Sequence, residues 1–536
     1  MFVCLTTLLL APPALPSQAL PSQTAEHQTA EHQTVKHQTV KHQTVKHQTV
    51  KHQTVKHQTV KHQTAPQQLR PQITTAGLPL AQTPSPQEYT TNQIVRPLPG
   101  SLNDVPVFNS NSPELVETPG ILLSTFPPAG MATPAAHLDF AFDGRFDVFA
   151  HHVYKALDYD EETPVLLDSM YLGVLVHNPG TEPVTVRTLQ AASYLSQPDA
   201  PFIQLPDFVP FSPLSPVYAG PGSRAMGDIL QGRRQDMFPA VLTIAPGENA
   251  MLLNQPIPIR ELEPPINGRS TLARVESSGP VYVASLAQPV GLNESGDEVA
   301  PPLASWEALL QTGELSGPRD RTPAPLPLEE GVQLIYGRVA GVSSGSLWEA
   351  TLTDSDANHS ETPEPAQNSP QLTIPDIGEA FSYGISLLYA GEMGTGQNQS
   401  AEMLVRYPDT AYESHGNYGV QYSLTLPLYN PTDAPKTVTV SLETAIKEDE
   451  LSADGLQFFE PLPTATFFRG PVQVRYQDGR GLPRIRNIHL VMKRGQPGTP
   501  LAEITIAPQS TSTVSVDLLY PADSTPPQVL TVKSTE

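Results

Sequence analysis

The sequence contains one cysteine, Cys4, among its 536 residues. No intramolecular disulfide can form, and zinc sites built on several cysteines are excluded. Only 16% of the residues are charged, and the net charge of -23 would repel a phosphate backbone. No basic stripe with interleaved aromatic residues offsets that charge, so we expect no nucleic-acid partner.

Proline is abundant instead: 59 of the 536 residues are proline, about twice the usual share of about 5%. Proline interrupts helix interiors and central strands, whereas edges, turns and linkers accept it. The composition therefore argues against long helices and favours short strands joined by many turns. A chain of this length has room for two or three domains. We predict a mainly β protein with two β-sandwich (immunoglobulin-like) domains behind a disordered N-terminal tether.

The N-terminus reads as a secretory signal peptide over residues 1–19. Its apolar run, MFVCLTTLLLA, is too short to span a bilayer, and Ser17-Gln18-Ala19 matches a cleavage site. The usual positive residues at its start are missing. No later stretch approaches the roughly 18 apolar residues of a membrane helix. We expect an exported protein of the periplasm, outer envelope or extracellular space, without a transmembrane span.

A pentapeptide repeat fills residues 25–64, with AEHQT twice followed by VKHQT six times, and it holds eight of the 15 histidines. Its polarity predicts disorder, and residues 20–92 form this tract and a Pro/Gln linker. Metal binding is the first alternative, but a five-residue spacing turns neighbouring histidines apart on a helix. The second is pH sensing, because protonated histidines would draw the tract toward the acidic body.

The remainder shows a pattern that occurs twice. Residues 171–195 and 422–445 each read as a hairpin with an Asn-Pro turn, at Asn178 and Asn430. Each is followed by a strand pair, at residues 241–254 and 502–520. The recurrence predicts β-rich domains over residues 93–286 and 331–530.

A further hairpin is predicted over residues 138–153, with its turn at Asp143-Gly144-Arg145 and Asp139 and Asp147 on the polar face. Residues 287–330 form a Pro-rich acidic linker with one helix over 306–312. Ser305 would be the N-cap of this helix and Gly313 would end it.

Several segments resemble a known family. They are RPLPGSLNDVPVFNSN from Arg96, DFAFDGRFD from Asp139, AGPGSRAMGD from Ala219 and NYGVQY from Asn417. The chain resembles, from about residue 93 to 530, a cyanobacterial family of exported proteins known only as a domain of unknown function. The resemblance implies an envelope location and supplies no reaction, cofactor or functional residue.

Two motifs with catalytic or metal-binding spacing have a simpler interpretation. Gly341-Val342-Ser343-Ser344-Gly345 matches the G-x-S-x-G nucleophile elbow, but a strand follows it where a helix is required, so we expect a turn between strands. Asp354, Asp356 and Asn358 have calcium-loop spacing, but His359 and Pro365 replace the required Gly and Glu. We expect an acidic loop there.

Two clusters remain as candidate sites. Asp139, Asp143, Asp147, His151 and His152 could bind a metal or transfer protons, although a solvated hairpin would place them equally well.

The Gly-rich stretch 219–234 brings together Arg224, Arg233 and Arg234. As a loop it could offer backbone N–H groups and guanidinium forks to an anion, such as an acidic sugar or phosphate. Arginines paired with the protein's own carboxylates explain it equally well. These three arginines are the predicted ligand-binding residues.

We predict a non-enzymatic envelope or extracellular protein that has a structural role or binds a surface polysaccharide or protein partner. We predict no catalytic residue, metal or cofactor. The alternative is a secreted hydrolase whose acidic residues meet only in the fold. The oligomeric state is open.

Overall fold

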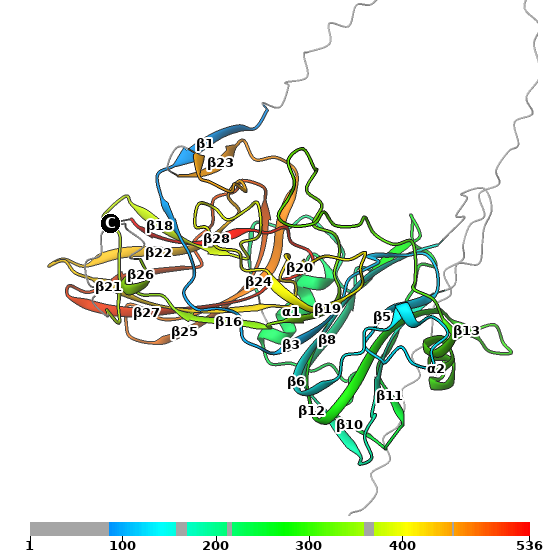
Figure 1. Ribbon diagram of the computed structural model, residues 1–536. Coiled ribbons are helices and arrows are strands. Elements are labelled where there is room, and N and C mark those ends of the chain that lie inside the picture. The colour runs from blue at the N-terminus through cyan, green and yellow to red at the C-terminus, as the bar shows by residue number, and fades with distance from the viewer. Residues whose placement is uncertain (1–84, 157–168, 212–216, 358–368, 453–454, 536) are drawn as a thin grey trace, which may run out of the picture. The chain divides into compact units, whose positions relative to one another are not determined.

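The computed structural model describes residues 85–156, 169–211, 217–357, 369–452 and 455–535. Over these ranges the chain is mainly β, as predicted, and its α-helices are α1 (Pro221–Leu230) and α2 (Leu303–Thr312) (Figure 1). The predicted signal peptide and pentapeptide tract lie outside the described residues. Within the described ranges, no helix is both long and apolar enough to cross a bilayer.

A first β-sandwich has two facing sheets that share one long strand. Its core contains Phe146, Val174 and Val283. The first sheet runs in the order β10 (Val241–Ile244), β8 (Val184–Leu195), β12 (Ile266–Pro289), β6 (Phe142–Lys155), β3 (Pro106–Ser110), β15 (Ala340–Ser344), β19 (Ala401–Arg406) and β20 (Glu413–Ser414). The second contains β5 (Gly120–Ser124), β7 (Met170–His177), β11 (Asn249–Ile257) and the end of β12.

A second sandwich forms around Tyr422, Leu442 and Val516. One of its sheets runs β16 (Leu347–Thr351), β21 (Gln421–Asn430), β27 (Ser510–Leu519), β24 (Thr466–Gln477), β25 (Pro483–Lys493) and β9 (Phe208–Pro210). The facing sheet runs β2 (Ile94–Arg96), β18 (Ala380–Ile385), β28 (Gln528–Ser534), β22 (Lys436–Glu443) and β26 (Ala502–Ile506). Shorter strands are β1 (Gln87–Thr91), β4 (Leu115–Val116), β13 (Gly291–Leu292), β14 (Glu298–Val299), β17 (Leu372–Thr373) and β23 (Leu456–Glu460).

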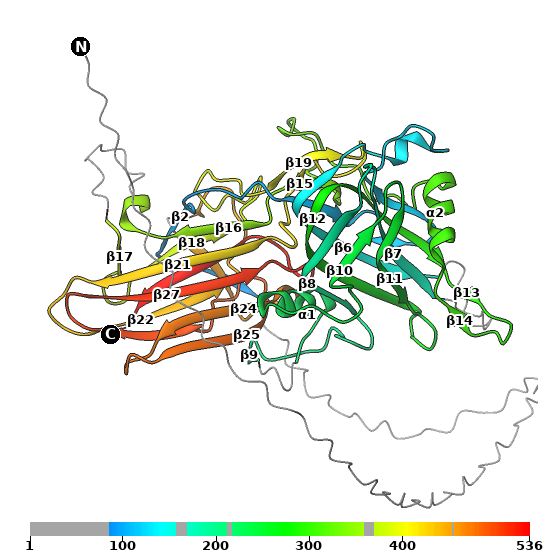
Figure 2. The same ribbon diagram turned by 90° about the horizontal axis from the view of Figure 1, so that it is seen from below.

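Strands from the two halves of the sequence enter each other's sheets. β15 and β19, from the C-terminal half, extend the first sheet, whereas β2 and β9 join the second sandwich. Helix α1 packs against β8 and β12 on one side and β24 on the other (Figures 1 and 2). The described residues accordingly belong to one compact unit.

Both helices cover outer faces of the first sandwich. Met226 and Ile229 of α1 pack on Phe149 of β6, and Trp306 of α2 packs over the opposite sheet. The predicted linker helix exists and ends at Gly313, but it begins three residues early, after Pro302. Ser305 is therefore not its N-cap, and the Ser305 hydroxyl donates to Gln288 instead (2.8 Å).

The segments 171–195 and 422–445 each contain two strands, but the prediction that these strands form hairpins is wrong. β7 pairs with β11 and β12, and β8 pairs with β10 and β12, so the turn after β7 passes from one sheet to the other. β21 and β22 are separated in the same way, because β21 pairs with β16, β17 and β27 while β22 pairs with β26 and β28. Alternation along a strand indicates a buried face but not the neighbouring strand.

The two Asn-Pro turns are built alike. The side-chain amide of Asn178 donates to the carbonyls of Glu182 (2.8 Å) and Ile244 (3.0 Å). That of Asn430 donates to Ala434 (2.8 Å) and Ile506 (3.0 Å). Both asparagines are fully buried. In each half a buried asparagine thus connects its turn by a hydrogen bond to the last residue of a later strand, β10 or β26.

Replacing either asparagine with alanine should lower the free energy of unfolding by about 1–3 kcal/mol, because a buried carbonyl at each site, that of Ile244 or Ile506, loses its donor. Urea denaturation of Asn178→Ala and Asn430→Ala measures this loss. The exposed Asn398 gives a control, since Asn398→Ala should change stability by less than about 0.5 kcal/mol. Losses at both turns no larger than the control's would show that the amides do not hold the turns.

The hairpin predicted over residues 138–153 is also wrong, because β6 runs unbroken through the predicted turn. Gly144 pairs with Ser277 of β12, and the register shifts between Ser277 and Val281. The positive φ of Gly144 (71°) is an irregularity at this point of the ladder and not a reversal of the chain. α1 covers the face of β6 that a hairpin would have left in water, so the strand is buried on both faces.

Candidate functional site

A cavity of about 780 Å³ opens among β6, the N-terminus of α1, β24 and the segments 196–203 and 522–525. Residues of both sandwiches line it, and its charged side chains come from distant parts of the sequence. Glu114, His151, Arg338, Arg469 and Asp523 supply the charge, and Phe202 and Tyr418 supply aromatic rings.

His151 occupies the β6 side of the cavity. Its Nδ1 lies 2.6 Å from the Ser270 hydroxyl, and its Nε2 lies 3.7 Å from a carboxylate oxygen of Glu114. Ser270 is fully buried and does not line the cavity, so its hydroxyl orients the imidazole and cannot reach a ligand. This fixed orientation directs Nε2 towards Glu114.

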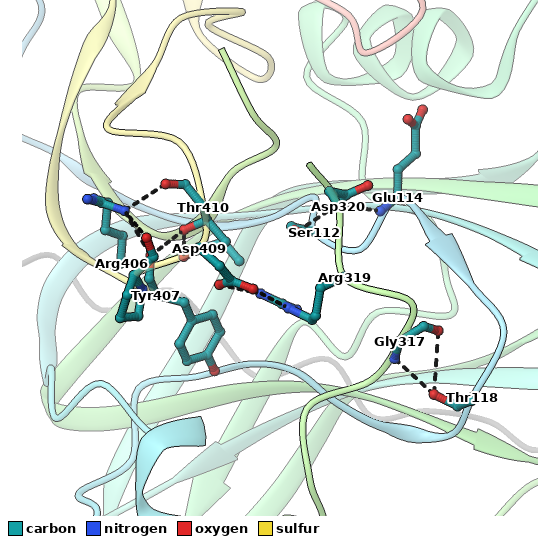
Figure 3. Close-up of polar contacts among 12 residues, drawn as sticks. Ser112, Glu114, Thr118, Gly317, Arg319, Asp320, Arg406, Tyr407, Asp409 and Thr410 are labelled. Carbon is teal, nitrogen blue, oxygen red and sulfur yellow. Dashed lines mark hydrogen bonds and ion pairs between the residues drawn. The ribbon is translucent and has the colours of Figure 1, made fainter. Parts of the chain in front are cut away.

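Glu114 is held through its backbone and its carboxylate. Asp320 accepts hydrogen bonds from the Glu114 amide (3.2 Å) and the Ser112 hydroxyl (2.7 Å). Figure 3 shows the Glu114 carboxylate pointing away from Asp320. Arg319, the residue before Asp320, makes a two-pronged ion pair with Asp409 (2.8 and 3.0 Å).

The charge of Glu114 is favoured by its neighbours. Arg338 and His151 both contact the carboxylate. Burial acts to raise the pKa of Glu114, but the hydrogen bond from His151 and the charge of Arg338 outweigh it and lower the pKa. Glu114 is thus an ionised acceptor at the cavity wall.

Asp523 contributes a second carboxylate, whose pKa is shifted in the opposite direction to that of Glu114. Its Oδ2 accepts hydrogen bonds from the Ser223 amide (2.8 Å) and hydroxyl (3.2 Å) in the first turn of α1. A Cβ on Gly220 would lie 2.3 Å from that oxygen, so glycine is required there for the close approach. Burial raises the pKa of Asp523, although His151 and the Ser223 hydrogen bonds act against the rise.

The remaining wall combines a cation with aromatic rings. The Arg469 guanidinium lies 5.2 Å from the ring centre of Phe202, and its buried Nε has no hydrogen-bond partner. Burial lowers the pKa of Arg469. Phe202 is 52% exposed and Ile203 is 45% exposed, so apolar surface is available at the mouth. Tyr418 donates to the Ser524 carbonyl (3.0 Å).

The predicted ligand-binding arginines lie around α1, away from the cavity lining. The stretch 219–234 is largely this buried helix, which corrects the expected loop. Arg224 donates to the Asp199 carbonyl and stacks on Tyr194 at 4.2 Å, and Arg233 pairs with Asp228 at 3.0 Å. Arg234 donates to the Phe238 carbonyl. Ligand binding by these arginines stays a prediction. Arg233 has the carboxylate partner that the alternative expected, whereas Arg224 and Arg234 donate to backbone carbonyls.

The predicted Asp/His cluster is dispersed along β6. Asp139 and Asp143 are exposed, whereas Asp147 is fully buried between arginines, which corrects its expected place on a polar face. His151 and His152 are successive strand residues and point to opposite faces. Only His151 reaches the cavity.

The other two motifs have structural roles. Ser343 lies inside strand β15, and the turn follows at Gly345, with β16 next, so no nucleophile elbow forms. Asp354 accepts hydrogen bonds from the amide (2.9 Å) and hydroxyl (2.7 Å) of Thr373. Asn358 lies outside the described residues.

Sequence reasoning did not find Glu114, Arg338, Arg469 or Asp523. Each stands alone in its own segment, without a partner at a recognisable spacing. The internal recurrence does not contain them either. The only available signal was His151, because a histidine in an apolar strand pattern marks a break in the expected composition.

Comparison with family models matches residues 93–534 to a family described as "Protein of unknown function (DUF3370)". No curated protein matches the sequence.

Proposed function

The chain belongs to the DUF3370 family of proteins of unknown function, and we propose that it is an exported binding protein whose cavity holds a segment of a surface polysaccharide. The observation that carries the proposal is the cavity itself, whose lining combines carboxylate, imidazole and guanidinium groups with an exposed aromatic ring. Both sandwiches contribute to it. We take each sandwich to be an immunoglobulin-like module that supports one wall.

The size and chemistry of the cavity suit a sugar chain. Its volume of about 780 Å³ falls within the usual 300–1,000 Å³ of ligand sites. Glu114 and Asp523 offer acceptor oxygens, and the Arg469 guanidinium offers donors, which matches the donor and acceptor hydroxyls of a sugar ring. Phe202 offers an apolar face for the C–H side of the ring. The open mouth would let a longer polymer continue past the site.

The export of the protein rests on the apolar leader and the Ser-Gln-Ala site at residues 17–19. An exported protein would meet surface polymers in the envelope, so a surface polysaccharide is the proposed partner. Fractionation of native cells tests the location separately from the ligand.

A second function, hydrolysis, is favoured by one observation. Two carboxylates in the same cavity have pKa values shifted in opposite directions, lowered at Glu114 and raised at Asp523. Such divergence is how one site keeps a base ionised beside a protonated acid. His151 interacts with both groups. In this alternative Asp523 would donate a proton to the leaving group and Glu114 or His151 would activate water.

Replacing Arg469 with glutamine should weaken binding of the recognised oligosaccharide by about 10- to 100-fold, because a hydrogen bond to a charged group contributes about 1.5–3 kcal/mol. The measurement is calorimetric titration with a panel of defined neutral and acidic oligosaccharides. Arg475, on the same strand and outside the cavity lining, gives the control, since Arg475→Gln should bind like the unmodified protein.

Asp523→Asn separates the two functions. A binding protein releases no new sugar ends from the panel, either unmodified or as Asp523→Asn. A hydrolase releases them, and Asp523→Asn loses that release while it still binds the sugar. If no oligosaccharide in the panel binds, or if Arg469→Gln binds as well as Arg475→Gln, the cavity is not a sugar site.

A further inference from the structure

The β24–β25 hairpin carries positive charge on an otherwise acidic protein. Residues 466–493 contain six basic residues and one acidic residue, Asp478, whereas the whole chain has a net charge of -23. Arg480 and Arg484 lie at or next to the turn, and Arg486 lies further along β25, where it donates to the Leu501 carbonyl (2.7 Å). Counted with Asp478, the three arginines give this end of the hairpin a net charge of +2 (three minus one).

The same turn exposes two aliphatic side chains. Leu482 is 51% exposed and Ile485 is 65% exposed, the highest value for a large hydrophobic residue among those described. They are separated by two residues and flanked by the arginines. Figure 2 shows this end of the hairpin on the side of the second sandwich that faces away from the first.

The carboxylate of Asp478 stabilises the turn through hydrogen bonds. Asp478 accepts hydrogen bonds from the amides of Arg480 (2.9 Å) and Leu482 (3.1 Å) and from Arg484 Nε (2.8 Å). Backbone hydrogen bonds and the ion pair with Arg484 lower the pKa of Asp478. The carboxylate of Asp478 is therefore bound within the turn. Its hydrogen bond from the Leu482 amide fixes the backbone at the position where the Leu482 side chain is exposed.

We propose that this hairpin docks the protein on an anionic lipid surface. Aliphatic side chains flanked by arginines fit a bilayer boundary, where the apolar groups enter the acyl region and the guanidinium groups meet anionic headgroups. A soluble polyanion would engage the arginines but would give Leu482 and Ile485 nothing apolar to contact. The net charge of the whole chain opposes docking only weakly, because charges more than about 8 Å apart are screened at physiological ionic strength. The surface is separate from the cavity and does not depend on a sugar ligand.

The chain provides a matched control in the β13–β14 hairpin. There Leu292 is 56% exposed and Val299 is 45% exposed, but acidic residues at positions 294, 297 and 298 accompany them. The two hairpins thus display similar apolar side chains with opposite charge.

The test is sedimentation of the full chain with vesicles of phosphatidylcholine alone and of phosphatidylcholine with phosphatidylglycerol. Binding should require phosphatidylglycerol and weaken with added salt. Leu482→Ser combined with Ile485→Ser should reduce the partition coefficient by roughly tenfold per side chain. Arg480→Gln should reduce it about fivefold. Leu292→Ser combined with Val299→Ser should leave it unchanged.

Three outcomes would overturn the proposal. One is the absence of binding to phosphatidylglycerol vesicles. Another is undiminished binding of the Leu482/Ile485 variant, which would identify a polyanion site without apolar insertion. The third is an equal loss in the β13–β14 control, which would show that exposed aliphatic residues act without the basic flank.

Discussion

Acidification from about pH 7 to about pH 4 should destabilise the protein by roughly 3 kcal/mol for each of two buried histidines, His152 and His489. Both are fully buried. His152 lies 2.8 Å from the Pro113 carbonyl and 2.9 Å from the Ser110 hydroxyl, and Nε2 of His489 accepts the Ala219 amide (3.1 Å). Burial lowers the pKa of each to about 4.

The sign follows from which state takes up protons. In the unfolded chain these histidines protonate near the ordinary pKa of 6.5, whereas in the folded protein they stay neutral until about pH 4. Between these values the unfolded state binds more protons, so stability falls as the pH falls through this window. Below about pH 4 both states are protonated and these histidines cause no further loss. Asp147 and Asp523, whose pKa values burial raises, act in the opposite direction and offset part of the loss.

Urea denaturation at pH 7 and pH 4.5 measures the effect, and His489→Gln isolates one contribution. The glutamine oxygen can accept the Ala219 amide but cannot titrate, so the difference in stability between the two pH values should shrink by most of the 3 kcal/mol assigned to His489. A variant with the same pH dependence as the unmodified protein would show that His489 does not cause the acid sensitivity.

The sequence predicted the parts of the fold that depend on local chemistry. The excess of proline and the period-two alternation gave a mainly β protein, and the two Asn-Pro turns were located at the correct residues. The repeat was real, because Asn178 and Asn430 make the same hydrogen bonds. Gly313 ends the linker helix where a glycine was expected to end it.

Strand pairing was the part that local patterns could not supply. β7 and β8 alternate as a hairpin would, but each pairs with strands more than 50 residues away in sequence. β6 was divided into a hairpin because burial was assumed on one face only. The second buried face exists because α1 covers it, and α1 had been interpreted as a glycine-rich loop.

The candidate site could not be predicted for the same reason. Glu114 and His151 belong to segments 37 residues apart, and Asp523 approaches from the opposite end of the chain. Their meeting depends on β3, β4 and β6 lying side by side and on the C-terminal segment reaching the first turn of α1. Without the fold, no spacing connects these residues.

Asp147 lies on the face of β6 that was expected to be exposed to solvent but is buried in the fold. It was expected in water, but its side chain is fully buried, paired with Arg145 and 3.6 Å from Arg274 directly opposite on β12. Burial raises the pKa of Asp147 against the charges of the two arginines. Arg274 also donates to Gln421 in the second sandwich (2.8 Å), so the carboxylate steadies a contact between the two sandwiches.

Asp147→Ala should therefore cost about 3–5 kcal/mol, because it leaves the buried charge of Arg274 without its partner. Asp143→Ala on the exposed part of the same strand should cost less than about 0.5 kcal/mol. Replacing both partners, with Asp147→Leu and Arg274→Met, should recover much of the loss, since two apolar groups leave no charge buried. Equal losses for Asp147→Ala and Asp143→Ala in chemical denaturation would contradict this account. A double variant less stable than Asp147→Ala would show that the contact with Gln421, and not the ion pair, gives Arg274 its importance.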